Sequence, residues 1–203
     1  MKLYRADDPA ALPMAKAALR RPGAVLLLPT ETVYGLVCRA DDESARRRIF
    51  ELKSRAGSKP LGWFVADWRM AERRGAIHTP AARAAAERHM PGALTMIVRR
   101  EGGGTVGFRV PDHPLLAALL RGIGEPLAQT SANRSGAPDA RDCREALAGL
   151  AGEVDLAVDA GELAPGACAS TVVDFSGETP KILRQGAVRL DLGGGGRGTE
   201  KCE

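Results

Sequence analysis

The chain has 203 residues and a mass of 21.4 kDa, which is the size of one ordinary domain. Hydrophobic residues make up 44% and charged residues 27%, and this balance excludes a disordered or collagen-like chain. The formal net charge is +4, and arginine outnumbers lysine by 23 to 6. Arginine suits phosphate and carboxylate ligands, but a GC-rich genome also produces an arginine excess, so the count alone identifies no ligand.

The predicted elements alternate between helices and strands. Asp8 and Pro9 are predicted to open a first helix, which ends near residues 21–23, and the apolar run 24–28 predicts a buried strand. Residues 42–52 are predicted to be a helix with one apolar face. Arg46, Arg47 and Arg48 do not lie on this face and are expected on the solvated surface of the helix. Further strands are predicted at 61–65, 94–98, 105–110, 127–130, 156–159, 171–175 and 181–183, and further helices at 80–89, 114–121 and 143–150.

These elements predict a single α/β domain with a twisted mixed sheet flanked by helices. The three consecutive glycines at 102–104 predict an antiparallel hairpin. Residues 102–107 also satisfy the dinucleotide pattern G-x-G-x-x-G, but no helix is predicted after them, so we reject that interpretation. The three histidines are far apart in sequence, and structural or surface roles are expected for them.

Nothing in the sequence predicts export, a membrane span or a metal site. Residues 1–9 contain no apolar stretch, and the run 24–29 is far shorter than the ~20 residues that cross a bilayer. We therefore expect a cytoplasmic protein with no membrane partner. The four cysteines form no C-x-x-C pair and none lies next to a histidine, so no residue is predicted to ligate a metal.

Polar side chains lie at the ends of several predicted strands. The segment 29–35 places two threonines, a glutamate and a tyrosine directly after a buried strand, although an ordinary capped loop would have a similar composition. Lys53 and Arg55 follow the helix 42–52, where the helix dipole alone would also favour cations. Residues 129–136 supply hydroxyl and amide groups beside a glycine. Together these strand ends indicate one shared cleft that binds anions.

The motifs resemble those of the YrdC/Sua5 family of threonylcarbamoyl-AMP synthases, in its short, single-domain type called TsaC. The blocks occur in the family's order from about Val25 to Val188: P-T-E-T-V-Y-G-L, K-S-R, P-G-A-L-T, F-R-V-P-D-H-P, T-S-A-N-R-S-G, A-S-T-V-V-D and I-L-R-Q-G-A. The resemblance implies a YrdC/RibB-like fold with a large open cleft. It assigns residues 1–190 to the catalytic domain and leaves 191–203 as a flexible, glycine-rich tail.

The family's reaction joins L-threonine, bicarbonate or CO2, and ATP into L-threonylcarbamoyladenylate and releases pyrophosphate. Other enzymes then transfer the threonylcarbamoyl group to adenosine 37 of tRNAs that read ANN codons. The resemblance therefore implies ATP, L-threonine, bicarbonate and this transfer machinery as partners, and it leaves a weak direct contact with tRNA open. Mg²⁺ is expected as a cofactor held mainly by the ATP phosphates.

The resemblance also assigns roles to residues. The catalytic positions correspond to Lys53, Arg55, Ser131 and Asn133; the threonine site to Thr32, Arg109, Ser131 and Ser170; and the ATP site to Arg55, Lys59, Thr105, Asn133 and Arg184. Lys59 stands where many relatives have asparagine, Phe64 where some have a histidine near threonine, and Arg141 where some have a threonine near the nucleotide. Phe64 and Arg141 are therefore not assigned to the site.

Two other functions are weighed against this one. A basic chain could be an RNA-binding module without catalysis, but aromatic residues are only 4%, which argues against base stacking. A carbamoyl-adenylate enzyme like the related domain of HypF is the other alternative, although HypF chains are much longer and carry further domains.

Overall fold

The computed structural model describes residues 1–54 and 60–190, and the strands among them form one mixed sheet. Their order is β1-β9-β2-β3-β8-β4-β7-β6-β10-β11, and β5 pairs with β6 outside this path. The strands are β1 (Lys2–Arg5), β2 (Leu26–Leu28), β3 (Gly35–Arg39), β4 (Gly62–Phe64), β5 (Ala76–Ile77), β6 (Leu94–Arg100), β7 (Thr105–Arg109), β8 (Leu127–Ser131), β9 (Leu156–Asp159), β10 (Thr171–Asp174) and β11 (Lys181–Arg184). Parallel and antiparallel pairs both occur, so the predicted mixed sheet and the β6–β7 hairpin are confirmed.

Four of the six helices of the described residues begin at a side chain that caps them. They are α1 (Ala11–Leu19), α2 (Glu43–Leu52), α3 (Trp68–Arg73), α4 (Pro80–His89), α5 (Pro114–Ile123) and α6 (Cys143–Ala148). The side chains of Asp42, Asp67, Thr79 and Asp142 each accept a hydrogen bond from a backbone N–H of the first turn. None of these helices is long and apolar enough to cross a membrane.

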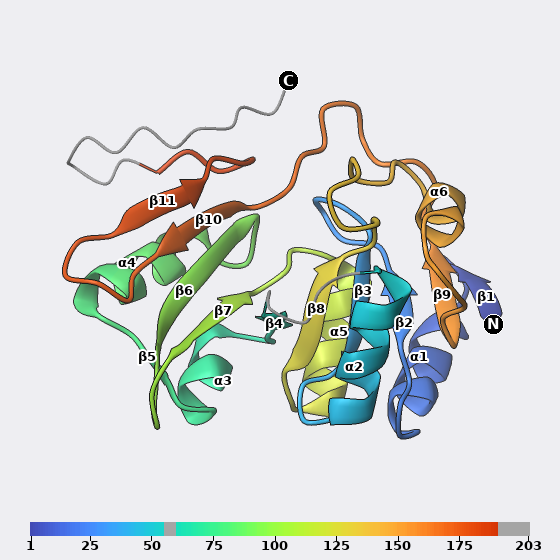
Figure 1. The fold of residues 1–203 in the computed structure, drawn as a ribbon, viewed down its shortest axis with the longest axis horizontal. Coiled ribbons are helices and arrows are strands. Elements are labelled where there is room, and N and C mark those ends of the chain that lie inside the picture. The colour runs from blue at the N-terminus through green and yellow to red at the C-terminus, as the bar shows by residue number, and fades with distance from the viewer. Residues whose placement is uncertain (55–59, 191–203) are drawn as a thin grey trace.

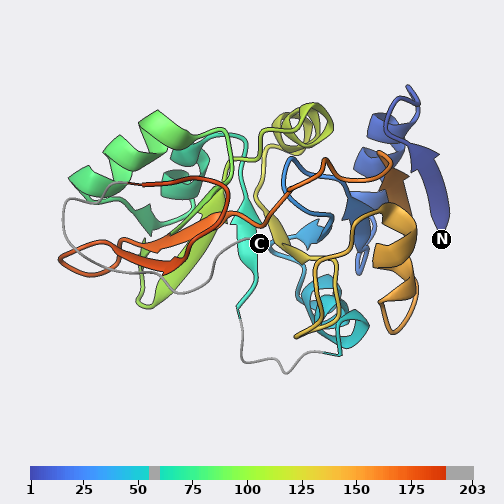
Figure 2. The same ribbon diagram turned by 90° about the horizontal axis from the view of Figure 1, so that it is seen from above.

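The helices cover the sheet in three groups, each with its own apolar core (Figures 1 and 2). Helices α1 and α5 pack on one face of the β1–β8 part of the sheet, and α2 and α6 pack on the other. Helices α3 and α4 pack on one face of β6, β7 and β10. The opposite face of these three strands belongs to none of the three cores, and it is where a ligand can reach the sheet.

The structure corrects several sequence predictions. The first helix begins at Ala11 rather than at Pro9, because the Asp8 carboxylate accepts a hydrogen bond from Ala10 N (2.7 Å) in the turn before it. Four elements were missed: β1, β3, α3 and β5. Strand β3 was overlooked because it begins at Gly35, the last residue of the polar segment 29–35, which was interpreted only as a loop.

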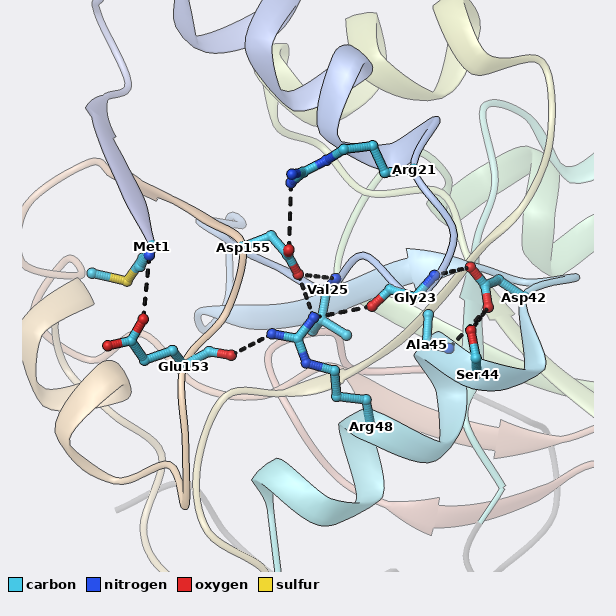
Figure 3. A network of polar contacts seen from close by, with 10 residues as sticks. All are labelled: Met1, Arg21, Gly23, Val25, Asp42, Ser44, Ala45, Arg48, Glu153 and Asp155. Atoms are coloured by element: carbon cyan, nitrogen blue, oxygen red, sulfur yellow. Dashed lines mark hydrogen bonds and ion pairs between the residues drawn. The ribbon is translucent and has the colours of Figure 1, made fainter.

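A network of polar contacts ties β2, β9 and α2 together (Figure 3). The Asp155 carboxylate accepts hydrogen bonds from Val25 N (3.0 Å), Arg48 NH1 (2.5 Å) and Arg21 NH2 (3.4 Å). Arg48 also donates to the carbonyl groups of Gly23 and Glu153. Arg48 was expected on a solvated helix surface, and its place in this half-buried network corrects that expectation.

Candidate active site

A cavity of about 610 Å³ opens on the uncovered face of the sheet. Six of the ten residues predicted for the site line it: Thr32, Thr105, Arg109, Ser131, Ser170 and Arg184. Lys53 and Asn133 lie behind the wall that Ser131 forms and are not among the lining residues. Arg55 and Lys59 lie outside the described residues, as does the predicted tail 191–203, so those predictions stay untested.

Arg109, at the end of β7, is the most deeply buried cation of the cavity wall, with 4% of its surface exposed. Its NH1 group donates to Thr32 Oγ1 (2.8 Å), and its NH2 group lies 3.6 Å from Glu31 Oε2. The guanidinium also stands 5.0 Å from the centre of the Phe64 ring. Burial lowers the pKa of Arg109 and the Glu31 carboxylate opposes this, while the positive charge of Arg184 lowers the pKa further. These contacts fix a planar cation in the cavity wall, where its guanidinium can pair with a carboxylate ligand.

The segment 29–34 brings Thr32 to Arg109 because Thr30 closes a tight turn. Thr30 Oγ1 accepts hydrogen bonds from the backbone N–H groups of Thr32 (3.0 Å) and Val33 (3.1 Å). Tyr34 anchors the end of the turn: its hydroxyl donates to Gly161 O (2.7 Å) and accepts from Ala160 N (3.0 Å). Burial raises the pKa of Tyr34 to about 12, so its phenol is a structural group and not a proton donor near neutral pH.

Ser170 and Arg184 form a second wall of the cavity. Arg184 Nε and NH2 donate to Ser170 O at 3.0 and 2.8 Å, and Ser170 Oγ shares a hydrogen bond with Thr95 Oγ1 (2.8 Å). Thr95 also lines the cavity, and the sequence motifs had not identified it. The arrangement adds two hydroxyls and a cation to the cavity lining.

Gly186 allows this wall to form. Its N–H donates to Thr171 Oγ1 (2.9 Å), and a Cβ atom at this position would lie 2.5 Å from the carbonyl carbon of Ser170 and 2.6 Å from Thr171 N. We expect Gly186→Ala to destabilise the fold by about 3 kcal/mol, because backbone atoms cannot yield as a flexible side chain can. Thermal unfolding followed by circular dichroism should show a Tm about 6–12 °C lower than that of the unmodified chain.

Gly177→Ala is the matched control, since a Cβ there would have Thr179 O as its neighbour at an ordinary 3.8 Å. The Tm of this control should stay within about 2 °C of the unmodified value, because a surface substitution changes stability by about 0.5 kcal/mol at most. Equal Tm values for the two variants would contradict the close approach at Gly186.

Lys53, which the resemblance assigned to the catalytic positions, makes contacts to the loop after β8 in the structure. It is 2% exposed, and its ammonium group donates to Ser131 O, to Asn133 O (2.5 Å) and to Asn133 Oδ1 (3.2 Å). Ser131 Oγ in turn donates to Asn133 Oδ1 (2.6 Å). In the structure Lys53 therefore holds the loop after β8 in place, and Ser131 is the member of this group that lines the cavity.

The cavity lining is strongly cationic. It includes Arg46, Arg100, Arg109 and Arg184, and no aspartate or glutamate is among the lining residues of the described chain. Arg46 was expected on a solvated helix surface and is exposed, but its place beside the cavity was not predicted. Arg100 was not singled out by any motif. No sequence signal distinguishes Arg46 from its neighbours Arg47 and Arg48, because the location of the cavity beside α2 is a property of the tertiary fold.

The two positions that depart from the family pattern have different surroundings. Phe64 is 1% exposed and packs beneath the Arg109 guanidinium, so it supports the cavity wall. Arg141 pairs with Glu162 (2.7 Å) and lines a separate, smaller hollow.

Among the histidines, His78 lies edge-on to the Trp68 and Phe108 rings (centroids 5.6 and 5.1 Å apart), and burial lowers its pKa, as expected for a structural role.

Comparison with known proteins gives a consistent picture. The Sua5/YciO/YrdC family model, described as "Telomere recombination", matches residues 18–186. A threonylcarbamoyl-AMP synthase of Chromohalobacter salexigens is 38% identical over 81% of this chain and 93% of its own length. The Bacillus subtilis threonylcarbamoyl-AMP synthase is 36% identical over 85% of this chain, which spans 52% of that protein.

The solved structures agree with the sequence relatives. The structure of Pyrococcus abyssi Sua5 complexed with L-threonine has a TM-score of 0.81 and 32% identity, covering 91% of this chain and 57% of that one.

Proposed function

Because the chain belongs to the Sua5/YciO/YrdC family, we propose that it is a nucleotidyltransferase that makes L-threonylcarbamoyladenylate from L-threonine, bicarbonate or CO2, and ATP, with release of pyrophosphate. The observation that carries the proposal is the buried Arg109, hydrogen-bonded to Thr32 in the wall of an arginine-lined cavity. This arrangement suits one substrate with a carboxylate and a second with phosphates.

The reaction needs two bond-forming steps. Bicarbonate takes up a proton and loses water to give CO2. The threonine ammonium group loses a proton, the neutral amine attacks the carbon of CO2, and the nitrogen releases a second proton as the carbamate forms. A carbamate oxygen then attacks the α-phosphorus of ATP, the bond from that phosphorus to the β-phosphate oxygen breaks, and pyrophosphate leaves. The cavity lining of the described chain offers no histidine, cysteine or carboxylate, so we assign catalysis to positioning and charge neutralisation rather than to a covalent enzyme intermediate.

The residues divide between the two substrates. Arg109 would pair with the threonine carboxylate, and Thr32 and Ser170 would complete that pocket. Thr105 and Arg184 would contact ATP, and Arg55, Lys59 and Asn133 remain ATP-site predictions from the family motifs. Lys53 would act by positioning Ser131, since its ammonium group bonds the Ser131 and Asn133 carbonyls.

Mg²⁺ would enter with ATP. The described residues contain no group of three or more His, Cys, Asp or Glu side chains that could hold a metal ion. The side-chain oxygen atoms of the cavity lining are those of hydroxyl groups and of the Gln129 amide, and these neutral groups suit an ion that keeps its phosphate and water ligands. When bound, the ion would neutralise phosphate charge.

The product would serve tRNA modification. We propose that it passes, in the cytoplasm, to the enzymes that transfer the threonylcarbamoyl group to adenosine 37 of ANN-reading tRNAs. A direct contact of this chain with tRNA would be weak and would rest on its basic charge.

The proposal predicts that pyrophosphate release requires every substrate. The assay measures pyrophosphate from Mg-ATP with L-threonine and bicarbonate together, and then with each omitted in turn. We expect release to fall to background on either omission, because without the carbamate the adenylyl group of ATP has no acceptor. Release that persists without threonine overturns the proposal, and activity with carbamoyl phosphate instead would favour the HypF-like reaction. Salt-sensitive RNA binding without ATP consumption would favour the RNA-binding alternative.

A further inference from the structure

The middle of the cavity floor carries one amide side chain among glycines. Gln129 on β8 pairs with Gly62 on β4, and Gly107 on β7 is the next residue across the sheet, before Ile97 on β6. Gln129, Gly62, Gly107 and Ile97 all line the cavity. The sequence analysis included Gln129 in the polar segment 129–136, but the family motifs assigned it no role of its own.

The Gln129 side chain lies across Gly62. A Cβ atom at Gly62 would lie 2.9 Å from Gln129 Nε2 and 3.8 Å from Gln129 Cδ, so the amide fills the space that a side chain at Gly62 would need. A Cβ atom at Gly107 would contact only Ile97 Cγ1 (3.6 Å) and Met96 O (3.9 Å). The floor beyond the amide is therefore open, and a bound group can approach the sheet there.

The amide is also available to a ligand. Within the described part of the chain it makes no hydrogen bond, although a glutamine amide offers two donor and two acceptor positions. The Gln129 residue is half-buried, and a half-buried amide without protein partners loses free energy unless water or a ligand satisfies it. The two hydrogen-bonding side chains nearest along β7, Thr105 and Arg109, are both directed to the same face as the cavity.

The position of the Gln129 side chain in the cavity indicates which substrate groups it would contact. Gly107 stands between Thr105 and Arg109, and each is two residues away, which is about 6.6 Å along a strand. This inference rests on the proposed function, in which Arg109 holds the threonine carboxylate and Thr105 contacts ATP. Between them the threonine-derived carbamate must meet the α-phosphate. We propose that Gln129 is a substrate-contacting residue, whose Nε2 group donates to the anionic oxygens brought together at this junction.

The first test is Gln129→Met, which keeps the length of the side chain and removes the amide. We expect kcat for pyrophosphate release to fall about 10²-fold, the cost of removing one oriented donor. The dissociation constants for threonine alone and for ATP alone, measured by calorimetry, should change less than about threefold. The carbamate and the α-phosphate meet at the Gln129 amide only when both substrates are bound. The Tm should stay within about 2 °C of the unmodified value.

The second test displaces the amide without removing it. Gly62→Ala places a methyl group against Gln129 Nε2, so we expect a similar fall in kcat. The double variant Gly62→Ala/Gln129→Met should be no slower than the slower single variant, because both changes remove one contact. Gly177→Ala, on the turn between β10 and β11, is the control, and its kcat should equal that of the unmodified enzyme.

The outcomes separate the two proposals. Unmodified kcat in Gln129→Met overturns the inference about Gln129, as does additive loss in the double variant. If the unmodified chain releases no pyrophosphate from threonine, bicarbonate and ATP, the proposed function itself fails. A tenfold or greater loss of threonine binding in Gln129→Met would also overturn the inference, because it would place the amide in the threonine pocket and not at the junction.

Discussion

Arg109→Met lowers kcat/KM for threonine about 10³-fold in pyrophosphate release, as the loss of a buried cation paired with a substrate carboxylate predicts. Methionine fills much of the same volume but donates no hydrogen bond. The KM for ATP should change far less, because Arg109 lies with Thr32 and Glu31 and away from Thr105, at the other end of β7. Steady-state kinetics with each substrate varied in turn measures both effects.

The same substitution also leaves Glu31 without its cation. Both carboxylate oxygens of Glu31 are buried and have no hydrogen bond within the described residues, and Arg109 NH2 is 3.6 Å away. Removing one partner of a buried ion pair costs about 3–5 kcal/mol. The double variant Glu31→Gln/Arg109→Met removes the uncompensated charge, so it should regain most of the lost stability in urea unfolding.

Stability and activity then report on different roles of Arg109. The double variant should be nearly as stable as the unmodified chain and still as inactive as Arg109→Met. Arg99→Met is the control, since Arg99 is exposed on β6, donates to Ser176 O (2.6 Å) and does not line the cavity. If the double variant regained threonine turnover along with stability, Arg109 would be a structural residue and not the carboxylate partner.

The elements that the sequence predicted correctly are those with local signals. Helix α2 has the capping residue Asp42 before it and apolar residues at helical spacing within it, and its predicted and observed bounds agree within one residue. The hairpin between β6 and β7 follows from glycines, all three of which have positive φ angles. The edge strand β1 gave no such signal, because its side chains are mostly exposed and polar.

The sequence predicted which residue types form the site, but it did not predict the contacts between them. Arg109 and Thr32 are 77 residues apart, and their contact depends on the placement of the 29–34 turn against the end of β7. Lys53 was predicted to act on phosphate, but a turn at Ser54, whose φ is +48°, follows it, and its ammonium group bonds residues 78 and 80 positions away. No local pattern encodes contacts over such separations.

Arg46 and Arg48 show the same limit within one helix. Two residues apart on α2, they differ in direction by about 200° around the helix axis. Arg46 faces the cavity, and Arg48 faces Asp155 on the opposite side. The sequence predicted both on a solvated helix surface, and only the tertiary structure shows that the exposed Arg46 lines the cavity while Arg48 is half-buried against Asp155.

Asp155 stabilises the strand β2 that leads into the cavity-lining turn with Thr32. It precedes β9 and accepts the N–H of Val25, which leads into β2, and β2 leads directly into the turn that carries Thr32. The carboxylate is 22% exposed and also pairs with Arg48 and Arg21 (Figure 3). Burial raises the pKa of Asp155, but the hydrogen bonds from Val25 and Arg48 and the two positive charges outweigh it, so the pKa lies below its usual value.

Asp155→Ala should therefore destabilise the protein by about 3 kcal/mol, because it leaves the Val25 N–H and the Arg48 guanidinium without their acceptor. In urea unfolding at pH 7 the midpoint should fall, and for a chain of this size the Tm should fall by about 6–12 °C. Asp155→Asn keeps one acceptor oxygen and the shape, so its loss should be smaller.

The pH dependence distinguishes a charged contact from simple packing. A carboxylate whose pKa is depressed in the folded state contributes its full stabilisation above its unfolded pKa of about 3.9, and loses it as the pH falls through the lower folded value. The difference in unfolding free energy between the unmodified chain and Asp155→Asn should therefore be constant from pH 6 to 8 and shrink below about pH 4. A difference that persists unchanged at low pH would mean that the shape of the side chain, and not its charge, holds β2 and α2 together.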